Sequence, residues 1–304
     1  MKQPRGGAAG DLMFFIFFII VLGIVWALTG GPERSISTSG PFLSPPFGER
    51  SSDGIPSVDI PDQGTRDNPL NAFTNPFAGL TEKKSPYASA IRLSAGRARS
   101  AGADEEYVRI ESTDDLAAPV NISSWKLVSS ETQYEATLGE ASPLPYSGRV
   151  NDQYVVMLPA ESTVYVVTGR SPIGTSFRTN VCTGYFTQFQ DFEPGLDKKC
   201  PLAEDELAER GLAVSEECKA YVEDINRCTL TTGTVPGNLG EVCRDFILND
   251  LTYAGCVARH QDEPGFYNNE WRLYLNRTSE LWKNANERIR LVDESGLLID
   301  SVSY

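Results

Sequence analysis

Histidine is almost absent from this chain, which has 304 residues and only one histidine, His260. A serine or cysteine nucleophile that relies on a histidine base would have to use this residue. Its neighbours, GCVAR before it and QDEP after it, are typical of a surface position rather than a catalytic one. We therefore expect no catalytic residues and predict that the chain is not an enzyme.

Several motifs that bind cofactors or metals are also missing. No GxGxxG or P-loop string is present, so nothing supports a nucleotide cofactor. No CxxC pair occurs, and the shortest cysteine spacing, from Cys218 to Cys228, is ten residues, unlike the close pairs of typical zinc sites. A D-x-[DN]-x-[DN]-G calcium loop is lacking, although DFEPGLD (191–197) and NDQ (151–153) leave an oxygen-ligated calcium site open. We expect no cofactor and no metal.

Positive charge is in short supply. The chain holds 27 basic and 41 acidic residues, a formal net charge of −14. Contacts to phosphates supply most non-specific affinity for nucleic acids, so an acidic surface argues against DNA or RNA as the main partner. The nearest approach to a basic patch is Arg92, Arg97 and Arg99. Acidic residues at 104–106 follow closely, and we interpret these arginines as part of a solvated strand face.

One long apolar run occurs near the amino end: residues 12–28 read LMFFIFFIIVLGIVWAL, without a charge. At ~1.5 Å per helical residue the run covers ~26 Å, close to the thickness of a bilayer core. We predict a transmembrane signal anchor at 12–29. Lys2 and Arg5 precede it and predict a cytoplasmic tip at 1–11 with the body outside the cell membrane. A cleavable signal peptide is the alternative, and it exports the body equally.

Cysteine usage agrees with an exported body. The six cysteines are an even number, fall in one 75-residue stretch, and avoid both the tip and the apolar run. Such usage predicts three disulfides in an oxidising compartment, with fifteen pairings possible. The half-cystine candidates are Cys182, Cys200, Cys218, Cys228, Cys243 and Cys256.

Residues 30–86 are dominated by Pro, Gly, Ser, Asn and Asp and show no sustained period of 2 or 3.6. This composition predicts a disordered stalk with a reach of ~40 Å. Its segment NAFTNPFAGL (71–80) could dock on the folded body instead.

From residue 87 the pattern changes to short runs rich in Val, Ile, Tyr and Thr, separated by turn residues. Strands at this spacing indicate a sandwich or barrel. In EYVRIES (106–112), Val108 and Ile110 alternate with polar residues, as in a strand with one buried face. ERIRLVD (287–293) and LLIDSVSY (297–304) predict a closing hairpin around DESG.

A stretch at 172–269 interrupts this rhythm. The segments at 203–212, 215–228 and 240–251 have helical composition, with apolar residues three or four positions apart. All six cysteines lie in the same stretch. We predict a helical, cysteine-rich insertion whose disulfides hold it where its apolar surface is too small.

Two segments resemble the lamin tail domain. EYVRIESTDDLAAPVNISSWKL (106–127) is similar to that family's opening strands, and LWKN (281–284), followed by ERIRLVDESGLLIDSVSY, is similar to its closing strands. The resemblance covers about 87–170 and 270–304 and departs from the family at Ser124, where a glycine is usual. It implies an immunoglobulin-like β-sandwich without a catalytic centre. The signature residues it implies are Trp125, Trp282, Asn284 and Gly296, with the two tryptophans in the core.

Together these features predict a mainly β protein. A lamin-tail-like sandwich at 87–304 would carry the helical insertion, and a single transmembrane helix would tether it to the cell membrane. The expected function is a non-catalytic, extracytoplasmic binding or scaffolding module. The insertion would then recognise an extracellular protein or polymer. The alternative is a surface hydrolase, or an accessory subunit of one, which would need a pair of carboxylates in a cleft lined by aromatic residues.

Overall fold

The computed structural model describes residues 17–24 and 83–304. The predicted tip at 1–11 and most of the predicted stalk lie outside these residues. Of the predicted transmembrane segment, residues 17–24 are described, and they form a helix whose large apolar side chains are exposed. Within the described ranges, no helix combines the length and the apolar character needed to cross a membrane. The strands and helices from residue 83 onward belong to one compact unit, Thr74–Tyr304.

Residues 83–86, predicted as the end of the stalk, are paired with the carboxyl-terminal strand. The Ser85 amide donates to the Leu298 carbonyl over 2.8 Å, and the Leu298 amide donates to the Lys83 carbonyl over 3.1 Å. Ser85 is buried by this pairing. Residues 83–86 therefore pack with the folded body, because a sheet edge supplies partners that composition does not reveal.

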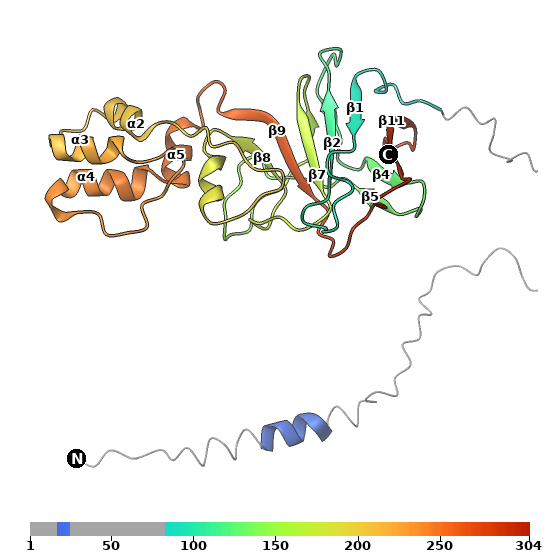
Figure 1. Cartoon of the computed structure of the whole chain (residues 1–304), viewed down its shortest axis with the longest axis horizontal. Helices are drawn as coiled ribbons and strands as arrows, with labels where there is room; N and C mark the ends of the chain where they lie inside the picture. The colour runs from blue at the N-terminus through green and yellow to red at the C-terminus, as the bar shows by residue number, and fades with distance from the viewer. Residues whose placement is uncertain (1–16, 25–82) are drawn as a thin grey trace, which may run out of the picture. The chain divides into compact units, whose positions relative to one another are not determined.

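The strands form three sheets (Figure 1). In the five-stranded sheet only β7 and β9 are parallel. Its order is β1 (Ile91–Ser94), β2 (Tyr107–Ser112), β7 (Thr163–Val167), β9 (Tyr267–Tyr274), β8 (Phe177–Asn180). The four-stranded sheet has the order β11 (Leu298–Ser303), β10 (Arg288–Val292), β4 (Lys126–Ser129), β5 (Glu135–Thr137). The small sheet pairs β3 (Val120–Asn121) with β6 (Met157–Leu158).

One hydrophobic cluster contains buried residues from both larger sheets. Along β2, Val108 and Ile110 are fully buried while Tyr107, Arg109 and Glu111, which alternate with them, are half-buried, as the alternation predicts. Trp125 is fully buried, and its indole N–H donates to a Glu294 carboxylate oxygen over 3.1 Å. Trp282 is buried in the same cluster.

Two of the four signature residues do not belong to the core. Asn284 is exposed in the connection before β10, and Gly296 is exposed in the turn between β10 and β11. Gly296 has a φ of 77°, which explains why glycine suits that position. The Asp293 carboxylate accepts from the Leu297 amide over 2.9 Å and closes the predicted hairpin. Asn284 and Gly296 thus lie in connections between strands, where backbone freedom or a polar side chain matters more than burial.

Ser124 adopts a left-handed backbone, with a φ of 82°. Its amide donates to the Leu138 carbonyl over 2.8 Å, and the next residue, Trp125, is fully buried. A residue with a Cβ is strained there, whereas glycine is not. We expect Ser124→Gly to raise the free energy of unfolding by about 0.5–1 kcal/mol. Denaturant unfolding of both proteins measures the difference, and a loss of stability would contradict this account.

Among the described residues, helices account for 22% and strands for 23%, so the fold is mixed rather than mainly β. Strand β8 lies inside the predicted insertion and pairs with β9. From residue 83 onward, the described helical elements all lie within residues 183–260, called the helical region below. They are η1 (Thr183–Gln188), α2 (Ala203–Arg210), α3 (Glu216–Glu223), η2 (Gly237–Leu239), α4 (Glu241–Asp245), η3 (Phe246–Asp250) and α5 (Tyr253–His260).

Candidate functional site

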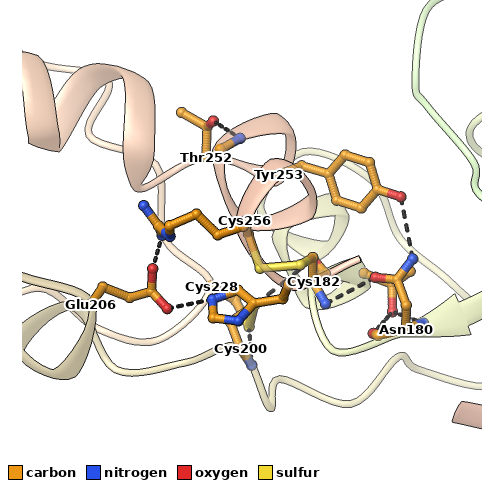
Figure 2. The surroundings of a disulfide bond; sticks show 12 residues. Asn180, Cys182, Cys200, Glu206, Cys228, Thr252, Tyr253 and Cys256 are labelled. Atoms are coloured by element: carbon orange, nitrogen blue, oxygen red, sulfur yellow. Dashed lines mark hydrogen bonds and ion pairs between the residues drawn. A yellow bond between two sulfur atoms is a disulfide. The ribbon is translucent and has the colours of Figure 1, made fainter. Parts of the chain in front are cut away.

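Three disulfides staple the helical region and its junction with the sheet. They are Cys182–Cys256, Cys200–Cys228 and Cys218–Cys243. This confirms the prediction of three bonds and leaves no cysteine thiolate to bind zinc. Cys182–Cys256 ties the segment just after β8 to α5 across 74 residues of sequence (Figure 2). The outermost bond therefore fixes both ends of the helical region to each other.

A polar contact beside this disulfide fixes the same junction (Figure 2). Asn180, the last residue of β8, accepts a hydrogen bond from the Cys182 amide over 2.9 Å and donates to the Tyr253 hydroxyl over 3.4 Å. The Tyr253 ring lies 4.3 Å from that of Phe186 and 5.4 Å from that of Tyr146. Burial raises the pKa of Tyr253, which keeps its hydroxyl neutral and able to hydrogen bond. The Cys182–Cys256 disulfide, Asn180, Tyr253, Phe186 and Tyr146 thus form a packed contact between the sheet and the helices, called the joint below.

A charged network connects α2 to α5 on the other side of the joint. The carboxylate of Glu206, which is only 3% exposed, lies 2.6 Å from His260 Nε2 and forms an ion pair with Arg259. Asp250 lies 3.5 Å from Arg259, and Glu263 lies 2.9 Å from His260 Nδ1. His260 is only 6% exposed, so its expected place on the surface is wrong. Because both ring nitrogens face carboxylates, the imidazole acts as a bridge between elements.

Helices α2, α3 and α4 have a hydrophobic core of their own, separate from that of the sheets. These three helices lie at one end of the compact unit described above, and β11 lies at the other end (Figure 1). Ser215 caps α3 by accepting from the Cys218 amide over 3.3 Å, and Cys218 carries the third disulfide. A small separate core of this size depends on such a staple. The result is a second, independently packed surface far from the carboxyl terminus.

A groove of about 230 Å³ opens between α2 and α3. Apolar and small residues form its floor, and charged residues form its rim. The floor consists of Leu207, Ala208, Gly211, Leu212 and Val214, and the rim of Glu204, Lys219 and Glu223. Residues 203–224, which contain both helices, hold eight acidic and two basic residues. The groove thus has an apolar floor, and the surface of α2 and α3 around it is predominantly acidic.

Two other cavities bear on the hydrolase alternative. One of about 560 Å³ has aromatic walls, Tyr146 and Tyr154, but a single carboxylate, Asp152. Another of about 400 Å³ lies beside His260 and has four carboxylates but no aromatic residue. In the described part of the chain, these cavities do not combine the two features that a carboxylate hydrolase needs.

The segments considered for calcium are engaged in other contacts. Glu193 pairs with Arg97 over 2.9 Å, and Asp197 pairs with Lys199 over 2.6 Å. The Asn151 carboxamide accepts from the Tyr146 amide and orders its own loop. Among residues 17–24 and 83–304, no group of three His, Cys, Asp or Glu side chains is placed to hold a metal ion.

The arginines of the possible basic patch also serve local contacts. Arg97 pairs with Glu105 over 3.2 Å in addition to Glu193. The Arg99 guanidinium lies 4.8 Å from the ring centroid of Tyr304, and Arg92 donates to the Ala88 carbonyl over 3.0 Å. These contacts agree with the interpretation of the three residues as a surface face.

Comparison with known proteins gives no relative: no family model, no curated protein and no solved structure matches the chain. Asn180 and Tyr253 of the joint, and Glu206 of the charged network, were not predicted from the sequence. The only local signal for α5 is Thr252, whose hydroxyl accepts from the Gly255 amide over 2.9 Å as an N-cap. The disulfides are the part of this site that sequence alone indicates.

Proposed function

We propose that the chain is a non-catalytic, membrane-anchored binding or scaffolding module outside the cytoplasm, and that its helical region recognises an extracellular protein or polymer. The observation that carries this proposal is the separate core of α2, α3 and α4, which the Cys218–Cys243 disulfide holds together at the end of the unit opposite to β11. A rigid support with a distinct projecting surface suits presentation to a partner.

The location follows from two features. Three disulfides are typical of an oxidising compartment outside the cytoplasm. Residues 17–24 form an exposed apolar helix inside the uncharged run at 12–28, which supports an anchor in the cell membrane. Lys2 and Arg5 before the run favour an amino terminus in the cytoplasm.

The supporting body belongs to the same proposal: residues 87–304 would form a lamin-tail-like, immunoglobulin-like sandwich that carries the helical region. The shared buried cluster of the two larger sheets supports two packed layers. Ser124 supports the resemblance, because the position where the family has glycine has a positive φ. The burial of Trp125 and Trp282 agrees with their role as core residues.

Site-specific photo-crosslinking on intact cells tests where the partner binds. A photoreactive residue replaces exposed Val242 or Leu248 in the helical region, or exposed Tyr134 or Val155 in the sheet-containing body as matched controls. We expect crosslinked partner at the first two positions and none at the controls. Adducts confined to the controls, or no adduct at any position, would contradict the proposal.

A further inference from the structure

We propose that the groove between α2 and α3 binds a basic amphipathic helix of a partner protein, with its apolar side chains in the groove and its lysines or arginines against the rim. This inference rests on the proposed function and names the chemistry of the partner. It is carried by three properties of the groove: its shape, its apolar floor and the charges that surround it.

The shape of the groove follows from the end of α2. Gly211 ends this helix with a φ of 59°, and a Cβ placed on it would meet no atom within 4 Å. The chain then turns through Leu212 and Val214, which are only half-buried, before α3 begins. Ala208 on α2 is exposed and presents only a methyl group to the same space. The floor is therefore apolar, shallow and open to solvent.

The size of the groove favours anchoring side chains over a free small molecule. Its volume of about 230 Å³ is below the ~300–1,000 Å³ of typical small-molecule pockets. In helix-in-groove recognition, one or two apolar side chains at i and i+3 or i+4 enter such a depression while the rest of the helix lies over it. An amphipathic helix supplies this arrangement.

The charges around the groove select a cationic partner. Glu204 and Glu223 are exposed on the rim, and neither has an ion-pair partner within the described residues. Lys219, the rim's basic residue, is paired with Glu216 over 2.7 Å, so its charge is offset. Unpaired carboxylates beside an apolar floor attract lysine or arginine and repel phosphate. The same charges disfavour an anionic membrane as the occupant.

The test uses the full chain in detergent and a synthetic peptide of about five helical turns, made only of leucine and lysine at a 3.6-residue period. Fluorescence anisotropy measures its affinity. Two control peptides are a leucine–glutamate version with the same apolar period and a leucine–lysine version with strictly alternating residues. We expect the first peptide to bind at least tenfold more tightly than either control.

Two variants assign that binding to the groove. Ala208→Arg places a long cationic side chain in the groove and should weaken binding at least tenfold, whereas Ala118→Arg, at an exposed position in the sheet-containing body, should leave it unchanged. Glu204→Gln with Glu223→Gln should weaken binding about three- to tenfold. The matched pair Asp115→Asn with Glu140→Gln removes the same charge elsewhere and should have no effect.

Several outcomes would overturn the proposal. Equal binding of the alternating peptide, or equal loss in Ala208→Arg and Ala118→Arg, would mean that net charge alone attracts the peptide. Stronger binding to phosphatidylserine vesicles than to the peptide, lost in Ala208→Arg, would assign the groove to membranes. Crosslinks at Val242 and Leu248 with no groove-dependent peptide binding would remove only this inference. Absent crosslinks would remove the proposed function itself.

Discussion

Replacement of Cys182 and Cys256 together by alanine is expected to lower the free energy of unfolding by about 4 kcal/mol. The bond closes a loop with a sequence separation of 74, and the chain-entropy relation gives about 4.5 kcal/mol for such a loop at 25 °C. Both cysteines lie in the cluster with Tyr253 and Phe186, so their loss also loosens the joint between sheet and helices. Denaturant unfolding of the detergent-solubilised chain measures the change.

Cys218→Ala with Cys243→Ala is the matched control. Its loop has a sequence separation of 25, for which the same relation gives about 3.5 kcal/mol. This bond lies in the separate core of α2, α3 and α4, so its loss should open only those helices. Limited proteolysis should cut the control variant near α2 and α3, and the variant that lacks Cys182–Cys256 between residues 183 and 200. Identical digestion patterns would contradict the assigned role of the joint.

Glu106→Ala is expected to lower the free energy of unfolding by about 4 kcal/mol, which is the second large effect. Glu106 is fully buried, and its carboxylate accepts from the Leu281 amide over 2.8 Å and from the Trp282 amide over 3.1 Å. Removal leaves two buried N–H groups unpaired, each at about 1–3 kcal/mol. It also frees the segment that places Trp282 in the core. Thermal or denaturant unfolding gives the loss, and a change below about 1 kcal/mol would contradict this role.

The same residue predicts a pH dependence. Burial raises the pKa of Glu106 in the folded protein above its ordinary value. Between these two pKa values the folded chain binds more protons than the unfolded chain, so this group's contribution to stability falls as pH rises. Glu106→Gln cannot titrate and should remove that slope, whereas the exposed control Glu105→Gln should keep it. An unchanged slope in Glu106→Gln would contradict the assignment.

Much of the sheet could be predicted because its signals are local. The runs that contain β2, β10 and β11 were predicted as strands, and in β2 Val108 and Ile110 are buried as the period-2 alternation requires. The helices α2 and α3 were identified by apolar spacing. Strand β8, with the sequence FRTN, was missed because it has no alternation of its own and forms by pairing with β9. Helix α5, with the sequence YAGCVARH, was missed, although Thr252 marks its start as an N-cap.

The sequence by itself determined the presence of three disulfides, the acidic net charge and the uncharged run at 12–28. Each of these depends on composition or short-range pattern. Only the tertiary structure decided which cysteines pair, that His260 is buried between two glutamates, and that α2 and α3 leave an open groove. These features depend on contacts between residues far apart in the chain, such as Glu206 with His260. A local pattern has no information about such contacts, because packing and loop closure across the whole domain bring those residues together.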